Sequence, residues 1–147
     1  MIKNERQYKR TKTLAVEAEV ALSQLDSSSE FKSLNPLAQK AHVSGLKRKL
    51  EQLSTELEDY ESLKSGSFDF AKLPEIEEIP RWLIQARIAR GLAQVDLARL
   101  LNLKKQQIQN YEATDYASAS LSRIREIAQA LSKIDTNGKS REIQLPD

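Results

Sequence analysis

The sequence predicts an all-α protein with two helical parts. Apolar residues recur at helical spacing through most of the chain, and the four prolines lie outside the long helical patterns. Charged residues make up 30% of the chain and aromatic residues only 5%, which is typical of a helix-rich protein with thin cores. A length of 147 residues allows one ordinary domain or two small ones. We divide the chain into a helical hairpin (1–66), a linker (67–80), a compact helical domain (81–134) and a tail (135–147).

A first long helix is predicted over residues 4–25. Its apolar seam alternates steps of three and four residues, which is the pattern of a coiled coil. The seam consists of Tyr8, Thr11, Ala15, Ala18, Leu22 and Leu25. After it, Asp26 and three serines compete for backbone hydrogen bonds and end the helix.

A second long helix is predicted from Pro36 to about residue 65, with Asn35 as its cap and Gly66 after its end. Its seam has the same spacing and consists of Val43, Leu46, Leu50, Leu53, Leu57 and Tyr60. The two seams either fold back on each other as an antiparallel coiled coil or pair with a second copy of the chain. Because the second helix is the longer one, part of its apolar edge should stay uncovered, which favours a homodimer.

The segment 67–80 differs from its surroundings. Phe68 and Phe70 alternate with polar residues, as in a short strand, and we expect Leu73 and Ile76 to pack on the domain that follows. The segment is acidic, and it is either a spacer or a docking segment for a partner. A two-stranded pairing of 68–72 with 141–145 is one alternative for the tail, and a disordered tail is the other.

Residues 81–134 contain four short helical patterns that must share one core, because none is long enough to be stable alone. The apolar positions are Leu83, Ile84, Ile88, Val95, Leu97, Leu100, Ile108, Tyr111, Leu121, Ile124, Ile127 and Leu131. The second pattern spans 94–101 and is followed by Asn102, a residue that tolerates a left-handed backbone at a helix end. The third pattern begins at Lys104.

The third helix carries the most informative polar face. Ile108 and Tyr111 are three residues apart and face inward, which leaves an outward face of amides and one ammonium group without a carboxylate. This face consists of Lys105, Gln106, Gln109 and Asn110. Amide groups can pair with adenine edges, and lysine can donate to guanine, in the major groove. A helix, a tight turn and a polar second helix form a helix-turn-helix arrangement.

This segment resembles the Cro/repressor-type (Xre) helix-turn-helix family over ARIARGLAQVDLARLLNLKKQQIQNYEA and the following SLSRIREIAQAL. The resemblance implies that Gln94 contacts a phosphate and braces the recognition helix, that Lys105, Gln106 and Asn110 meet bases, and that Lys104 and the loop 114–120 lie near phosphates. The full candidate DNA-binding set is Gln94, Lys104, Lys105, Gln106, Gln107, Gln109, Asn110, Thr114 and Ser118. Two departures are Ala93, where a capping Ser or Thr is common, and Asn102, where Gly is usual.

Charge supports contact with nucleic acid. Residues 81–134 hold nine Lys and Arg against four Asp and Glu, a net charge of +5, whereas the whole chain carries +2. A local positive surplus is what phosphate binding requires. The alternative is a protein-binding domain that no longer contacts DNA.

We therefore expect a four- to five-helix Cro/repressor-type domain that acts as a sequence-specific DNA-binding regulator, a repressor or autoregulator. It would bind an approximately palindromic operator as a homodimer, and its architecture resembles that of antitoxins, which bind a toxin protein. The competing function is a protein-binding scaffold or adaptor.

Other classes of protein find little support. We expect no enzyme, because no catalytic set and no Gly-rich phosphate loop occurs. We expect no metal and no cofactor, since the chain has no cysteine and His42 is its single histidine. No apolar run approaches the ~20 residues of a membrane helix. The charged N-terminus lacks the apolar region of a signal peptide, so we expect a soluble, cytoplasmic protein.

Overall fold

The computed structural model describes residues 1–133, and within them every regular element is a helix. The all-α prediction is therefore confirmed. The chain divides into two compact units, Met1–Tyr60 and Glu61–Asp147. No helix in residues 1–133 has both the length and the apolar character that a membrane crossing requires.

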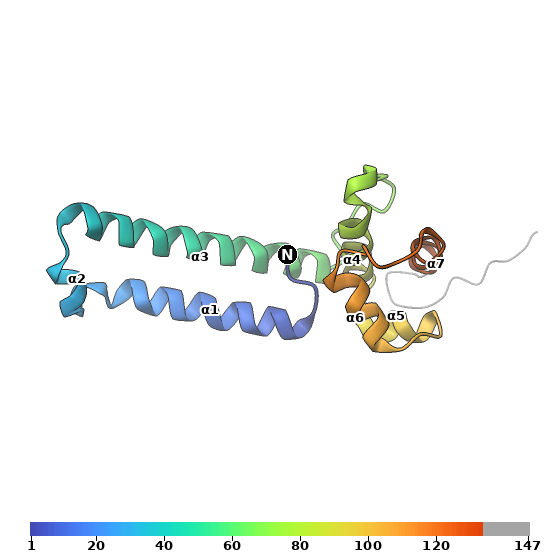
Figure 1. Cartoon of the computed structure of the whole chain (residues 1–147), viewed down its shortest axis with the longest axis horizontal. Helices are drawn as coiled ribbons and strands as arrows, with labels where there is room; N and C mark the ends of the chain where they lie inside the picture. The colour runs from blue at the N-terminus through green and yellow to red at the C-terminus, as the bar shows by residue number, and fades with distance from the viewer. Residues whose placement is uncertain (134–147) are drawn as a thin grey trace, which may run out of the picture. The chain divides into compact units, whose positions relative to one another are not determined.

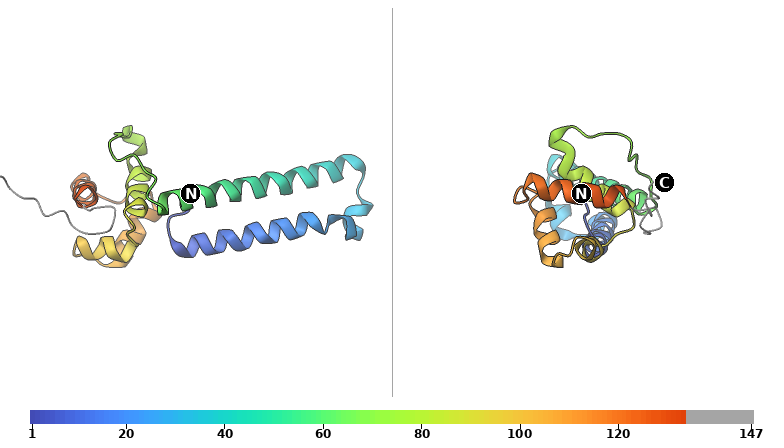
Figure 2. Two further views of the ribbon diagram at one scale, coloured as in Figure 1. Left: turned by 180° about the vertical axis from the view of Figure 1, so that it is seen from behind. Right: turned by 90° about the vertical axis from the view of Figure 1, so that its right-hand side faces the viewer.

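The first unit is built around two long helices that run antiparallel, side by side (Figure 1). The view from behind in Figure 2 shows the same pairing. Its elements are α1 (Glu5–Ser23), η1 (Leu25–Ser27), α2 (Ser29–Ser33) and α3 (Pro36–Lys64). The Asn4 and Asn35 side chains cap α1 and α3, because each Oδ1 accepts a backbone N–H three residues later, at 2.9 and 2.8 Å.

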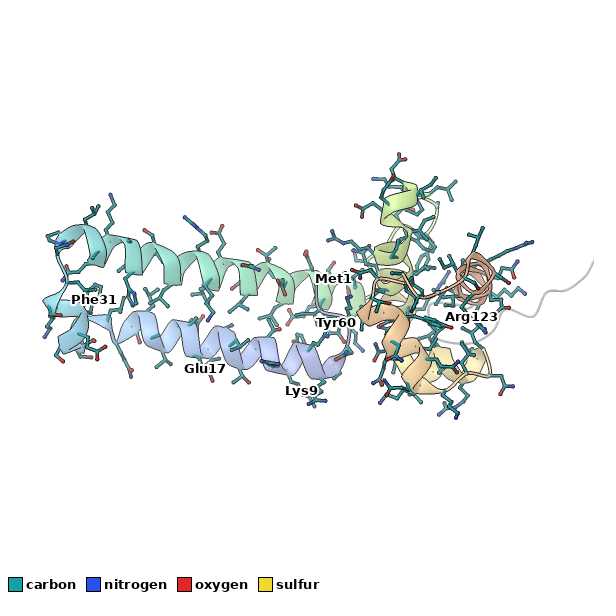
Figure 3. The ribbon with its side chains drawn as sticks, in the orientation of Figure 1. Met1, Lys9, Glu17, Phe31, Tyr60 and Arg123 are labelled. Atoms are coloured by element: carbon teal, nitrogen blue, oxygen red, sulfur yellow. The ribbon has the colours of Figure 1, made fainter. Side chains whose placement is uncertain are left out.

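Side chains fill the space between α1 and α3 (Figure 3). Thr11, Ala15 and Ala18 of α1 are buried, whereas the seam leucines of α3 are only half-buried. Small side chains on one facing helix cannot cover four leucines completely. The hairpin therefore keeps partly exposed apolar surface along α3.

The end of the hairpin away from α2 is closed by the N-terminal residues. Ile2 is buried, and the Met1 amino group lies 3.9 Å from a Glu56 carboxylate oxygen. Tyr8 and Tyr60 stack with ring centroids 5.1 Å apart. The residues before α1 thus cover part of the extra length of α3, so the apolar surface that remains runs along the seam itself.

The second unit contains the short helices. They are η2 (Ile76–Glu78), α4 (Ile79–Ala89), α5 (Gln94–Leu100), α6 (Lys105–Ala113) and α7 (Leu121–Ser132). α5 packs against α6, and α4 packs against α7. Their common core consists of the fully buried side chains Leu83, Ile84, Leu97, Ile108, Ile127 and Leu131.

Three apolar residues that the helical spacing placed in this core are exposed instead. Val95 and Leu100 lie on α5, which has only 7 residues and buries a strip formed by Leu97 and Ala98. Leu121 is 82% exposed, because it is the first residue of α7 and lies in the turn before the helix reaches the core. Periodicity identified the helices correctly but overestimated the width of their buried faces.

The prediction for residues 67–80 was wrong in two respects. Residues 68–72 form no strand, and Leu73 and Ile76 are 86% and 80% exposed. The phenylalanines pack on the domain in their place: Phe68 lies 5.6 Å from the Trp82 ring, and the Arg90 guanidinium lies 3.7 Å above Phe70. Phe68 thus gains an aromatic contact and Phe70 a cation–π contact, which Leu73 and Ile76 cannot make. Residues 141–145 lie outside the described residues.

Candidate nucleic-acid interface

The turn between α5 and α6 sets the angle between the two helices. Asn102 has a positive φ of 52°, the left-handed conformation predicted for it. The Leu103 N–H then donates to the Ala98 carbonyl at 2.8 Å, which closes the end of α5. The chain reverses within a few residues, and α6 begins at Lys105, with Lys104 as the residue that precedes its first turn.

The inward side of α6 is fixed by Ile108 and by a buried carboxylate. Glu112 has no exposed surface, and its carboxylate receives two N–H groups of the Arg87 guanidinium from α4, one of them (Nη2 to Oε2) at 2.9 Å. Arg87 also donates through Nη1 to the Leu92 carbonyl at 2.7 Å. Because a buried charge is tolerated only when it is paired and hydrogen-bonded, this network defines one position for α6 against α4.

Gln94 joins the same network from α5. Its Nε2 donates to Glu112 Oε2 at 2.7 Å, and the residue is only 8% exposed. The structure thus places this candidate residue beneath α6, with its amide nitrogen bound to protein. α4, α5 and α6 all meet at one carboxylate, Glu112.

The outward side of α6 presents polar groups to solvent. Lys105, Gln106 and Asn110 are exposed, and Gln109 is half-buried. Gln106 Nε2 donates to Asn110 Oδ1 at 3.0 Å, a bond between neighbours one helical turn apart. The four side chains expected to contact bases therefore all come from α6, and none of them is buried with Ile108.

Lys104 and Gln107 lie at the start of the helix. Both are exposed, and the Lys104 backbone N–H donates to Gln107 Oε1 at 3.1 Å. Gln107 thus uses its carbonyl oxygen to close the first turn of α6, and the Lys104 ammonium extends from the helix N-terminus, where an anion is favoured.

The loop after α6 carries the last two candidate residues. Thr114 and Ser118 are exposed and lie with their hydroxyl oxygens 3.3 Å apart. Between them Asp115 and Tyr116 both have positive φ, 47° and 60°, and the Tyr116 N–H donates to the Tyr111 carbonyl at 2.7 Å. This tight reversal brings the loop back beside the end of α6.

Comparison with known proteins agrees with this geometry. Residues 83–136 match the family model described as helix-turn-helix, in its Cro/C1-type, Xre-like form. This segment is a Cro/C1-type helix-turn-helix domain. No curated protein and no solved structure matches the chain.

The helix-turn-helix domain belongs to a DNA-binding family rather than to an enzyme family. α5 and α6 are the two helices of this domain that the tight turn joins. Lys105, Gln106, Gln109 and Asn110 lie on the part of α6 that is not buried in the domain core.

The charge on the surface of the helix-turn-helix domain is smaller than the sequence count suggests. Arg87 is neutralised by Glu112, and Arg90 is buried over Phe70 with its Nε donating to the Leu131 carbonyl. Arg123 pairs with Glu126 on the surface of α7. Within residues 1–133, the exposed cations of this domain that have no carboxylate partner include Arg81, Lys104, Lys105, Arg125 and Lys133. Lys104 and Lys105 of this set lie at the start of α6.

The sequence analysis missed Arg87 and Glu112, the buried pair that holds α6 in place. The signal was present, because Glu112 follows Ile108 by four residues and therefore lies on the inward face of α6. A carboxylate on an inward face needs a buried cation, and Arg87 has a corresponding inward place in α4.

Proposed function

We propose that this protein is a cytoplasmic, sequence-specific DNA-binding transcriptional regulator. It acts as a homodimer held by its N-terminal hairpin. The observation that supports it best is the exposed amide and lysine face of α6 on a helix whose opposite side is held by the buried Glu112 network. A recognition helix that is fixed before binding loses little freedom on the DNA.

The candidate residues divide into two groups in this proposal. Lys105, Gln106, Gln109 and Asn110 contact base edges in the major groove, since amides and lysine have the donors and acceptors required. Lys104, Thr114 and Ser118 contact phosphates and set the position of the helix. Gln94 lies near the DNA backbone and also braces α6 through its hydrogen bond to Glu112. Gln107 keeps the first turn of α6 closed.

Dimerisation raises the affinity of a module whose surface charge is modest. A second recognition helix joined to the first binds its half-site in an effectively intramolecular step. Two half-sites about 34 Å apart, one turn of B-DNA, form an approximately palindromic operator. Occupancy of such an operator at a promoter excludes polymerase, which makes repression, including repression of its own gene, the expected outcome.

The test is fluorescence anisotropy at about 150 mM salt, where non-specific binding is weak. Wild-type protein should bind the DNA upstream of its own gene much more tightly than scrambled DNA. Gln106→Ala should relax base preference at one position by about 1–3 kcal/mol. Gln52→Ala, an exposed amide of α3, is the control and should change neither affinity nor preference. Equal, weak binding to both DNAs would contradict the proposal.

A second candidate function is that of an antitoxin, which would hold a partner protein as well as DNA. The observation in its favour is the pair of exposed side chains Leu73 and Ile76, flanked by the exposed glutamates Glu75, Glu77 and Glu78. A neighbouring gene for a small toxin, and co-purification of its product with this chain but not with a Leu73→Ser/Ile76→Ser variant, would support it.

A scaffold that does not contact DNA is the remaining alternative. Joint replacement of Lys105, Gln106 and Asn110 by alanine separates it from a regulator. A scaffold should still bind its protein partner after this change, whereas a regulator should lose its preference for the operator sequence.

A further inference from the structure

The charges of α3 are segregated along the helix. Residues 40–49 contain four basic residues and no acidic one, and residues 51–61 contain five acidic residues and no basic one. The change of sign falls at Leu50, which is the midpoint of α3 (Pro36–Lys64). A helix whose charges invert about its own centre is complementary to a reversed copy of itself.

Four of these charges form a straight stripe beside the apolar seam. They are Lys40, Lys47, Glu51 and Glu58, separated by seven, four and seven residues, a spacing that keeps them on one flank of the helix. All four are exposed. None makes an ion pair or a side-chain hydrogen bond with another of the described residues 1–133. The hairpin therefore leaves this stripe without a partner.

The apolar residues nearest to the stripe are also incompletely covered. Val43, Leu50 and Leu57 lie on the stripe side of the seam, and each is half-buried in the isolated hairpin. Ser54, a small residue, lies between Glu51 and Glu58 on the same flank, where it allows another helix to approach closely. The flank thus combines three half-covered apolar side chains with a border of unpartnered charges.

We propose that a second copy of this chain docks antiparallel on this flank of α3, with the two-fold axis near Leu50. This inference rests on the homodimer in the proposed function and specifies its interface. In that arrangement Lys40 faces Glu58 of the second copy, and Lys47 faces its Glu51. The same contacts recur on the other side of the axis, as an isologous dimer requires. A parallel arrangement would place like charges opposite each other.

The apolar and the charged residues have different roles in this interface. Val43, Leu50 and Leu57 lose their remaining contact with water, which supplies affinity. The ion pairs are at the border, where solvent weakens them, so they mainly select the orientation and the register of the two helices. At 1.5 Å per residue, α3 offers a contact length of about 43 Å.

The test is sedimentation equilibrium of the full chain without DNA, with paired charge-reversal variants. Lys40→Glu/Lys47→Glu makes the stripe wholly acidic, and Glu51→Lys/Glu58→Lys makes it wholly basic. Each variant alone should dimerise at least tenfold more weakly than wild type. A one-to-one mixture of the two should form heterodimers at close to wild-type affinity, which also shows that both variants are folded.

Two controls complete the experiment. Arg48→Glu/Asp59→Lys reverses two exposed charges on the face of α3 opposite the seam and should leave the dimer unchanged. The chain has no cysteine, so chains with Lys40→Cys should form disulfides when mixed with chains carrying Glu58→Cys, and neither should do so alone. A disulfide between two Lys40→Cys chains, in the absence of the Glu58→Cys chains, would indicate a parallel dimer and overturn the proposal.

The remaining outcomes are distinguishable. A monomeric wild type at about 100 µM overturns the interface and the homodimer together. A wild-type dimer that the stripe variants leave intact overturns only the interface on α3. DNA binding is measured separately by anisotropy, so neither result is confused with a failure to recognise DNA.

Discussion

The guanidinium of Arg87 and the carboxylate of Glu112 form a doubly hydrogen-bonded ion pair in the interior of the second unit, where Arg87 is 2% exposed and Glu112 is fully buried. The pair joins α4 to α6 across 25 positions of sequence. The stability of the domain and the position of the polar face of α6 therefore depend on the same contact.

The first prediction concerns this pair. Glu112→Gln keeps the size of the side chain but leaves the Arg87 charge buried without a counter-charge, so the free energy of unfolding should fall by about 3–5 kcal/mol. Urea denaturation followed by circular dichroism measures it. The double variant Arg87→Met/Glu112→Leu removes both charges and should lose less stability than Glu112→Gln. It should not reach wild type, because the Gln94 amide and the Leu92 carbonyl each lose a hydrogen-bond partner. A loss below about 1 kcal/mol in Glu112→Gln would show that the pair contributes little.

The second prediction concerns the start of α5. Ala93 has the extended backbone of a cap residue (φ −71°, ψ 163°), and its N–H donates to Asp96 Oδ2 at 2.8 Å, but its methyl group cannot accept a hydrogen bond. Ala93→Ser should complete the capping box and raise the free energy of unfolding by about 1 kcal/mol. Ala93→Val offers no acceptor and should give no gain. An unchanged melting temperature in Ala93→Ser would contradict the prediction.

The third prediction concerns alkaline pH. Burial raises the pKa of Tyr116 well above its usual value of 10, with a further rise from the Glu112 charge, and its hydroxyl has no hydrogen-bond partner among the described residues. Below pH 10 the phenol is protonated in both the folded and the unfolded chain. Above pH 10 only the folded chain retains the proton, so stability should fall by about 1.4 kcal/mol per pH unit until the folded pKa is passed.

Tyr116→Phe tests this effect directly. The variant should lack that part of the alkaline loss, and at pH 7 it should be as stable as wild type or more so, because a buried hydroxyl without a partner is removed. Unfolding free energies of both proteins between pH 7 and pH 11 provide the comparison, in which the other tyrosines cancel. Parallel curves for the two proteins would rule out the proposed role of Tyr116.

The fourth prediction concerns the salt dependence of DNA binding. If Lys104 contacts one phosphate, Lys104→Ala should weaken binding to every sequence alike and reduce the slope of log K against log salt concentration by about 0.9. Lys9→Ala is the matched control: Lys9 is exposed on the outer side of α1 (Figure 3) and should not change the slope. A loss of base preference in Lys104→Ala would move Lys104 into the base-contacting group.

Helical periodicity and capping residues identified most of the fold. The seams of α1 and α3 predicted two long helices, and Asn35 and Asn102 occupy the cap and the left-handed turn that their chemistry suggested. Such features depend on residues within one or two turns of each other. They can therefore be deduced from local sequence.

The contacts of residues 67–78 could not be deduced in this way. Leu73 and Phe70 are both apolar residues of one short segment. Trp82 of α4 and Arg90 at the end of α4 provide the surface on which the phenylalanines pack, whereas Leu73 stays exposed. Similarly, Leu121 has the spacing of a core residue, but no helix among residues 1–133 covers it.

The sequence by itself determined the all-α class, the two long helices, the helix-turn-helix segment and the polar face of α6, because each follows from spacing along one helix or from one tight turn. Only the tertiary structure decided which cations face solvent and what holds α6 in place. Arg87 and Glu112 count as two ordinary charges in the sequence. Their burial together removes both from the surface and turns them into the contact that positions α6, since a charge leaves water only where an opposite charge and hydrogen bonds replace its hydration.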